Sequence, residues 1–240
     1  MLFIIYAVIG WCMEVVCKLI QYKKFVDRGF LIGPYCPIYG VGALLITFFL
    51  NKYVQDPVVL FVMAVVVCGI LEYLTSYFME KIYHARWWDY SSKKFNINGR
   101  ICLSNLIAFG ILGMFIMYIS NPFLIGQLEK LPSLWLNIIF WSVLSIFVID
   151  NIVSGIINNS IKTTTKQLGE KMDNTEEITK KVREILQKKS ALHRRLINAY
   201  PKIQAVKFKI KEKTRKIKEQ IEEQKEDIKD KIDELEDPVY

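Results

Sequence analysis

Apolar residues fill the first two thirds of the chain in long runs, and short polar segments separate one run from the next. An α-helix needs about 20 apolar residues to cross the hydrocarbon core of a bilayer. We predict five membrane spans from these runs, at residues 1–20, 37–54, 58–82, 102–120 and 134–157. The pattern therefore predicts an all-α, polytopic membrane helix bundle, with a transmembrane domain over residues 1–158.

The second run leaves two interpretations open. Pro37, Gly40 and Gly42 lie near its start, and residues of this kind interrupt or restart helices. The run is therefore either a full span or a re-entrant segment that enters the bilayer and returns.

Positive charge alternates between the predicted connections. The loops 21–36 and 83–101 and the C-terminal tail are rich in Lys and Arg, whereas the other two connections carry only Lys52 and Lys130. Basic loops stay on the cytoplasmic side of a membrane. We therefore expect the N-terminus outside and the C-terminus in the cytoplasm, which requires an odd number of spans.

The predicted cytoplasmic tail, residues 159–240, changes the sign of its charge along its length. Residues 162–218 hold 18 Lys and Arg against 6 Asp and Glu, whereas residues 219–237 hold 3 against 10. Anionic lipid attracts basic segments next to a membrane, so we expect the first part to lie near the bilayer. The tail is interpreted as a solvated helical extension.

Apolar residues in the tail recur at intervals of seven. Two such rows run from Ile203 to Leu235 and predict a thin coiled-coil seam, suited to self-association or to a partner helix. The dipeptide Tyr200-Pro201 predicts a break between two helices, the second starting at Pro201.

Two glutamates lie in the third apolar run or at its edge. On a helix, Glu72, Ser76 and Glu80 share one face and are one turn apart. A charged side chain inside the bilayer costs several kcal/mol, so such groups face the bundle interior and mark a pathway or a site. We therefore predict that this stripe of residues lines a polar path.

Other charged side chains lie in the first and fifth runs. Glu14 and Lys18 have the spacing and order of a helical ion pair, which leaves open a self-neutralised pair at the membrane interface. Asp150 has no cation near it in the sequence, so Lys18 and Arg100 are candidate partners from other elements. A shared cavity in the cytoplasmic half would explain all the acids. The candidate binding or pathway residues are Glu14, Lys18, Glu72, Ser76, Glu80 and Asp150.

The two basic loops combine turn residues with aromatic ones. Glycine and proline in the first loop are typical of a defined turn. In the second loop the aromatic residues could anchor the chain at the bilayer interface. Alternatively, Arg86, Asp89 and Arg100 could form an ion network that holds the loop against the ends of the spans. The candidate loop residues are Arg28, Gly33, Pro34, Tyr39, Arg86, Trp87, Trp88, Asp89, Tyr90, Asn96 and Arg100.

Known catalytic and nucleotide-binding motifs are missing from the sequence. It has no G-x4-G-K-[ST] phosphate loop, no HExxH and no nucleophile elbow, so no catalytic residue is assigned and enzymatic activity is left open. Its five cysteines have neither CxxC nor metal-ligand spacing, and its two histidines lie far apart. We expect no metal, no cofactor and no nucleic-acid partner.

Several motifs resemble those of a known family. They are Gly10-Trp11 with Glu14, Arg28 to Leu31 with Gly33-Pro34, Pro37 to Gly40, Glu72-Tyr73 with Thr75-Ser76 and Glu80, Arg86 to Ser91, and Phe95-Asn96 with Gly99 to Ile101. Over about residues 3–155 the chain resembles the CmpB family of bacterial ABC-transporter type IV membrane proteins. The resemblance implies a multi-pass protein of the bacterial cytoplasmic membrane and a separate cytoplasmic ATPase subunit as partner. It implies neither a substrate nor a catalytic residue.

Three functions are compatible with these patterns. The first is a permease-like transporter component whose buried carboxylates line a polar cavity. The second is a membrane enzyme that acts on a lipid or lipid-linked substrate at the cytoplasmic face, with Glu80, Arg86 and Asp89 as reacting or phosphate-binding groups. The third is a membrane scaffold or regulator that acts through its helical tail. Loss of function in Glu72→Gln favours the first two, and loss on removal of the tail favours the third.

Overall fold

The computed structural model describes residues 1–169, 172, 174–201 and 203–205. Contacts divide the chain into two compact units, Met1–Val206 and Lys207–Tyr240. All described residues belong to the first unit. The predicted coiled-coil rows lie outside the described residues, apart from Ile203, which is buried in the first unit.

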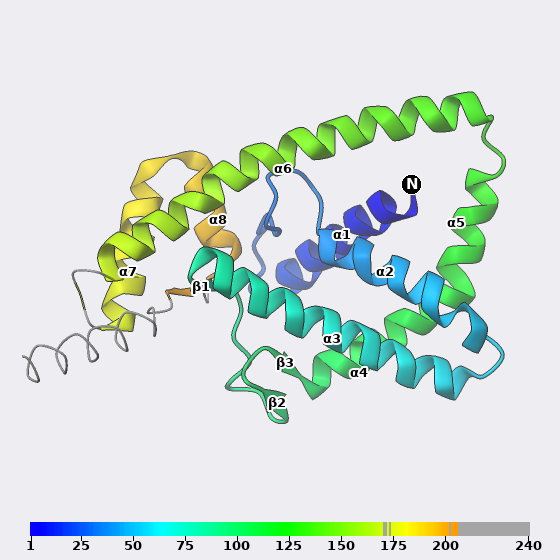
Figure 1. Cartoon of the computed structure of the whole chain (residues 1–240), viewed down its shortest axis with the longest axis horizontal. Helices are drawn as coiled ribbons and strands as arrows, with labels where there is room; N and C mark the ends of the chain where they lie inside the picture. Colours follow the sequence, from blue (N-terminus) through cyan, green and yellow to red (C-terminus); the bar gives the residue numbers. More distant parts are fainter. Residues whose placement is uncertain (170–171, 173, 202, 206–240) are drawn as a thin grey trace, which may run out of the picture. The chain divides into compact units, whose positions relative to one another are not determined.

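Four helices in the described part of the chain are long and apolar enough to cross a membrane (Figure 1). They are α1 (Leu2–Tyr22), α3 (Pro57–Tyr83), a composite helix over Leu103–Leu128, and α6 (Ser133–Gly169). The composite helix consists of α4 (Leu103–Phe115), the π-helical turn η2 (Ile116–Ser120) and α5 (Asn121–Leu128). These helices confirm the prediction of an all-α fold with membrane-length apolar helices, whereas the number of spans remains a prediction.

The second predicted span contains a shorter helix. Helix α2 (Pro37–Leu50) has 14 residues, which is a length of about 21 Å, and the turn η1 (Asn51–Tyr53) follows it. It packs against both α1 and α3. Gly10 permits the close contact with α1, because a Cβ atom at this position would collide with the ring of Tyr39.

The C-terminal part of the first unit forms a compact structure, which we call the C-terminal cap: α7 (Thr175–Lys189), α8 (Ala191–Ala199) and β4 (Gln204–Ala205). Both helices are amphipathic. Their apolar faces form one core with Ala85, Trp87 and Ile161. Asn174 and Ser190 accept hydrogen bonds from the first-turn N–H groups of α7 and α8, which fixes where the helices begin.

A short sheet connects the C-terminal cap to the second loop. Strand β4 pairs antiparallel with β1 (Ala85–Arg86), and Ala205 lies opposite Ala85. The prediction of a helix starting at Pro201 is therefore wrong for Gln204 and Ala205, which form sheet hydrogen bonds instead. In the same loop β2 (Asn96–Ile97) pairs with β3 (Ile101–Cys102).

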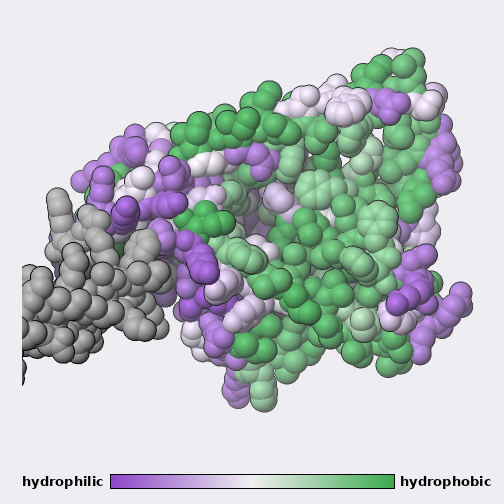
Figure 2. Space-filling view, in the orientation of Figure 1, coloured by the Kyte–Doolittle hydropathy of each residue, from purple (hydrophilic) through white to green (hydrophobic). Residues whose placement is uncertain are grey.

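The two predicted cytoplasmic loops and the C-terminal cap lie at the same end of the helices (Figure 1). Hydrophilic residues gather at this end, and hydrophobic ones cover much of the helical surface in the view of Figure 2. Helix α6 runs through residue 158 without a break, and much of its membrane-length part is exposed, as at Leu134, Trp141 and Ile149. Such exposure is expected of side chains that face lipid.

Candidate functional site

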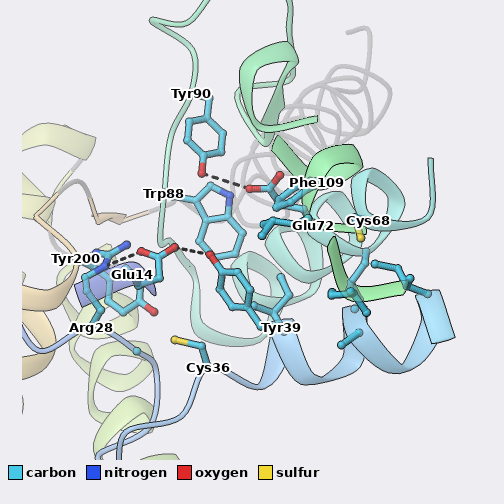
Figure 3. A pocket seen from close by; sticks show the side chains of 18 residues that line it. Glu14, Arg28, Cys36, Tyr39, Cys68, Glu72, Trp88, Tyr90, Phe109 and Tyr200 are labelled. Atoms are coloured by element: carbon cyan, nitrogen blue, oxygen red, sulfur yellow. Dashed lines mark hydrogen bonds and ion pairs between the residues drawn. The ribbon is translucent and has the colours of Figure 1, made fainter. Parts of the chain in front are cut away.

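A cavity of about 160 Å³ lies between α1, α2, α3 and α4, near the loop end of the helices (Figure 3). It is also lined by Arg28, Gly29 and Cys36 of the first loop, by Trp88 and Tyr90 of the second loop, and by Tyr200, which follows α8. The polar lining residues are Glu14, Arg28, Cys36, Tyr39, Cys68, Glu72, Trp88, Tyr90 and Tyr200, and the apolar ones include Ile46, Leu71, Phe109, Leu112 and Ile116.

Glu14 is the first acid of the cavity, and both of its carboxylate oxygens have partners. Its Oε2 lies 3.2 Å from Nε of Arg28, and its Oε1 accepts a hydrogen bond of 2.8 Å from the hydroxyl of Tyr39. Arg28 also donates to the carbonyl of Ala199 and lies over the ring of Tyr200. The arginine therefore connects α1, the first loop and the end of α8.

Glu72 is the second acid, and its carboxylate has no cation partner among the described residues. Its Oε1 accepts hydrogen bonds from the hydroxyl of Tyr90 at 3.2 Å and from the amide of Asn105 at 3.4 Å. Its Oε2 is buried and has no hydrogen-bond partner among the described residues. Six other buried side-chain atoms of these residues also lack a partner, so Glu72 is distinguished by its place in the cavity lining.

Aromatic rings form a large part of the cavity wall (Figure 3). Tyr39, Trp88, Tyr90, Phe109 and Tyr200 all line it. Trp88 is held by a hydrogen bond from its indole Nε1 to the carbonyl of Arg100. Burial, followed by the negative charge of Glu72, raises the pKa of Tyr90 well above its ordinary value, so its hydroxyl remains a donor.

A separate ion network lies two turns along α3 from Glu72. The Oε2 of Glu80 lies 3.0 Å from Nε of Arg86 and 3.0 Å from a terminal nitrogen of Arg100. Arg86 also lies 3.7 Å from Asp89, and Arg100 donates to the hydroxyl of Ser76. The predicted network of Arg86, Asp89 and Arg100 therefore forms around Glu80.

The hairpin that carries this network depends on Asn96 and Gly99. The Asn96 amide donates to the carbonyls of Ser91 and Lys93, and its Oδ1 accepts from the N–H of Gly99. Gly99 has a φ of +66°, and a Cβ there would meet Asp89 Oδ1 at 2.5 Å. Glycine is therefore required at this position on both grounds.

Trp87, next to Trp88 in the sequence, lies in a different environment. Its ring is 2% exposed and packs among Phe30, Tyr83 and Tyr200 in the core of the C-terminal cap. The prediction of an interfacial anchor therefore does not describe Trp87, since its ring contacts protein on all sides.

Asp150 and Lys18 do not meet, and neither lines the cavity. Asp150 accepts hydrogen bonds from the backbone N–H groups of Ile32 and Gly33 and from Ser154, with no cation partner in the described part of the chain. Lys18 donates to Gln21. The predicted partners of Asp150 are therefore wrong, and the Glu14–Lys18 pair does not form because Glu14 binds Arg28 instead.

The structure thus brings some of the predicted residues together and separates others. Glu14, Arg28, Tyr39, Glu72, Trp88 and Tyr90 share the cavity, whereas Lys18, Gly33, Pro34, Ser76, Glu80, Arg86, Trp87, Asp89, Asn96, Arg100 and Asp150 lie outside its lining. Our sequence analysis missed Cys36, Cys68, Phe109 and Tyr200. Helical spacing of Phe109 and Leu112 on α4 and Ile116 at the start of η2 was the available signal for one wall.

Within the described residues, no group of three or more His, Cys, Asp and Glu side chains is arranged to hold a metal ion. The recognition groups of the cavity are instead one unpaired carboxylate, one neutralised ion pair and several aromatic rings.

Membrane-length apolar helices, with a cavity between them that has acidic and aromatic residues in its wall, are the features of a membrane protein with a candidate internal site. The chain belongs to the family described as "Putative ABC-transporter type IV" (ABC_trans_CmpB), whose model matches residues 1–155. The matched residues include every cavity residue except Tyr200. No curated protein matched the chain. No solved structure matched it either.

Proposed function

We propose that this chain is the membrane-spanning, permease-like component of a transporter, and that a solute binds in the cavity beside Glu72. The observation that carries the proposal is the carboxyl of Glu72, which lines the cavity and has no cation partner in the described residues. The description of the family as an ABC-transporter type supports the same function.

The cost of burying charge explains why this oxygen is informative. A buried ionised group is stabilised when it is paired and hydrogen-bonded, and destabilising when it is not. Glu80 and Glu14 each have an arginine, whereas Glu72 has only neutral donors on one of its two oxygens. A solute that interacts with the carboxyl of Glu72 would offset the free-energy cost of burying it. Release of the solute would restore that cost.

The arrangement of the helices fits a protein that spans a bacterial cytoplasmic membrane several times. The end of α1, the start of α2, the end of α3, the start of α4 and the C-terminal cap all lie on one side (Figure 1). We propose that this side is cytoplasmic and that the N-terminus is outside. Helix α2 with η1 then forms the shortest of five crossings.

Energy for transport would come from a separate subunit, because the chain lacks a phosphate-binding loop. We propose that a cytoplasmic ATPase docks on the C-terminal cap and the two loops. Gentle-detergent purification of the whole protein is expected to recover an ATPase activity that depends on these elements.

Access to the cavity from both sides of the membrane tests the transport function without knowledge of the solute. Cys68 lines the cavity and serves as a natural reporter. In a protein where the other four cysteines are replaced (Cys12→Ala, Cys17→Ala, Cys36→Ala and Cys102→Ala), a small membrane-impermeant methanethiosulfonate is added to right-side-out or inside-out vesicles. A transporter alternates its access, so Cys68 should react from both sides.

Modification of Cys68 from one side only would contradict transport and favour the enzyme or the scaffold. The structure gives less support to the enzyme, because Glu80, Arg86 and Asp89 bind one another and none lines the cavity.

The scaffold hypothesis predicts a different result. Removal of residues 207–240, which form the second unit, would then abolish function, and Glu72→Gln would have little effect. Transport predicts the opposite ranking of the two variants.

A further inference from the structure

We propose that the cavity selects a small organic monocation with an apolar body, such as a protonated amine or a quaternary ammonium ion. This inference rests on the proposed function of the cavity as a solute site, and it names the class of solute. Three properties of the cavity support this ligand class: its charge, its aromatic lining and its volume.

The charge of the lining is unbalanced by one. Glu14, Arg28 and Glu72 are its charged residues. Glu14 and Arg28 neutralise each other at 3.2 Å, so the remaining formal charge of the lining is that of Glu72, whose carboxyl pairs with a cation in its ionised form. A monocation would balance this charge, and an anion would be repelled by it.

The nearest basic residues of the second loop do not supply that balance. One terminal nitrogen of Arg100 pairs with Glu80, and the other donates a hydrogen bond to the hydroxyl of Ser76. Arg100 does not line the cavity. Arg86 is engaged by Glu80 and Asp89. The network around Glu80 is neutral as a whole, with two arginines and two acids, so it leaves the charge of Glu72 uncompensated.

Aromatic rings are part of the cavity lining that includes Glu72. Tyr39, Trp88, Tyr90 and Phe109 line the same cavity as Glu72 (Figure 3). The faces of such rings attract organic cations, and enclosure of a quaternary ammonium group by several rings is a recurring recognition mode. An aromatic wall beside an unpaired carboxylate therefore favours an amine-like headgroup.

The remaining lining defines the size and polarity of the rest of the ligand. Ile46, Leu112 and Ile116 form an apolar side of the cavity. Its volume of about 160 Å³ is close to the roughly 150 Å³ of an engineered apolar cavity that binds benzene. The ligand is therefore a compact molecule with a cationic end and an apolar end.

Inorganic cations fit the site less well. Calcium takes six to eight oxygen ligands and magnesium about six, whereas the described residues offer no group of three or more metal-binding side chains.

Three probes of nearly equal shape test the inference on the full-length protein in lipid nanodiscs. Benzylamine is a cation at pH 7, benzyl alcohol is neutral and benzoate is an anion. Binding is measured by equilibrium dialysis and by the fluorescence of Trp88, with Trp88→Phe as the optical control. We expect benzylamine to bind at least tenfold more tightly than benzyl alcohol, and benzoate to bind most weakly.

Variants of Glu72 identify the source of the preference. Glu72→Gln should reduce the preference for benzylamine over benzyl alcohol to less than threefold, and Glu72→Asp should retain it. The matched control is Glu129→Gln, which removes one exposed negative charge outside the cavity. It should leave all three affinities unchanged.

Equal binding of benzylamine and benzyl alcohol, tighter binding of benzoate, or no binding of any probe by the wild-type protein would overturn the inference. If Glu72→Gln does not fold, the wild-type comparison still decides. Labelling of Cys68 from both sides together with no cation preference would remove this inference and leave the transport function. Preference for the cation together with labelling of Cys68 from one side only would contradict the transport function and leave the cavity as a cation-binding site.

Discussion

Glu72 and Glu80 lie on the same face of α3, two turns apart, and the protein treats them differently. Glu80 is bound by two arginines at 3.0 Å each. Glu72 receives only neutral donors, and one of its oxygens has no partner in the described part of the chain. The comparison separates an acid that is paired within the protein from an acid that we propose is available for a ligand.

The position of the second loop explains why Glu80 has arginine partners and Glu72 has none among the described residues. Helix α3 ends at Tyr83, and the chain turns back so that Arg86 and Arg100 lie beside Glu80 at the end of the helix. Glu72 is eight residues earlier, which is about 12 Å further along the helix axis. The arginines are held by Glu80, so the inner acid remains without a cation.

Removal of one cation from the paired acid is expected to have the largest effect. Arg100→Met leaves Glu80 and Ser76 with fewer partners in a buried network, and loss of one member of a buried pair costs about 3 to 5 kcal/mol. The measurement is the free energy of unfolding in detergent. Lys93→Met, an exposed change in the same loop, is the control. Equal stability of the two variants would show that the network does not hold the loop.

Asp150 is a third acid, satisfied by backbone N–H groups instead of arginines. Asp150→Asn removes its charge and replaces one acceptor by a donor that faces an N–H group. Loss of a hydrogen bond to a charged group costs about 1.5 to 3 kcal/mol. Asn151→Ala, an adjacent exposed position, should change the free energy of unfolding by much less. A reversed order would contradict a structural role of Asp150.

Filling the cavity should change the free energy of unfolding less than Arg100→Met or Asp150→Asn does. It should strongly reduce the access of a thiol reagent to Cys68. A Cβ at Gly42 would lie in ordinary contact with Leu71 and Cys68, so Gly42→Leu extends into the cavity without a backbone collision. We expect the free energy of unfolding to change by about 1 kcal/mol or less, and the labelling of Cys68 to slow at least tenfold. Gly126→Leu, at a helical position with no neighbour within 4 Å, is the matched control. Unchanged labelling in Gly42→Leu would place the reagent's path elsewhere.

The smallest effect on stability concerns the thiol of Cys36, which also lines the cavity. Burial, followed by the negative charge of Glu14, raises the pKa of this thiol to about 12. At pH 8 its alkylation by iodoacetamide should be on the order of a thousandfold slower than that of an ordinary thiol, because the thiolate is the reactive form. Glutathione, a small thiol alkylated under the same conditions, is the comparison.

The same shift gives a pH dependence with a definite sign. The folded protein holds the Cys36 proton more tightly than the unfolded chain, so this contribution to stability is present below about pH 9 and is lost as the pH rises toward 12. Replacement by Ala should flatten the unfolding profile in that window. Equal rates for Cys36 and glutathione would contradict the buried position of Cys36.

Local patterns predicted the helices and the buried acids, because apolar run length and helical spacing are properties of neighbouring residues. The stripe of Glu72, Ser76 and Glu80 does share one face, as the spacing requires. The partners of the acids were harder to predict. Glu14 binds Arg28 from the first loop instead of Lys18 from its own helix, since the loop folds back over the end of α1.

Long-range contacts account for the remaining differences. Asp150 binds backbone N–H groups, which every residue except proline offers and which therefore have no sequence signature. Tyr200 reaches the cavity from the other end of the chain, because β4 pairs with β1 and places the end of α8 beside Arg28. No periodicity within the tail predicts that contact.

The most direct test of the central claim is the unfolding free energy of one matched pair of variants, Glu72→Gln and Glu80→Gln. Both replace an acid by its neutral isostere on the same face of α3. Glu80→Gln should destabilise the protein by about 3 kcal/mol because it leaves the buried Arg100 without a carboxylate and Arg86 with only Asp89. Glu72→Gln should leave stability unchanged or raise it. Equal losses in the two variants would show that Glu72 is a structural acid, and the account of the cavity as a solute site would be contradicted.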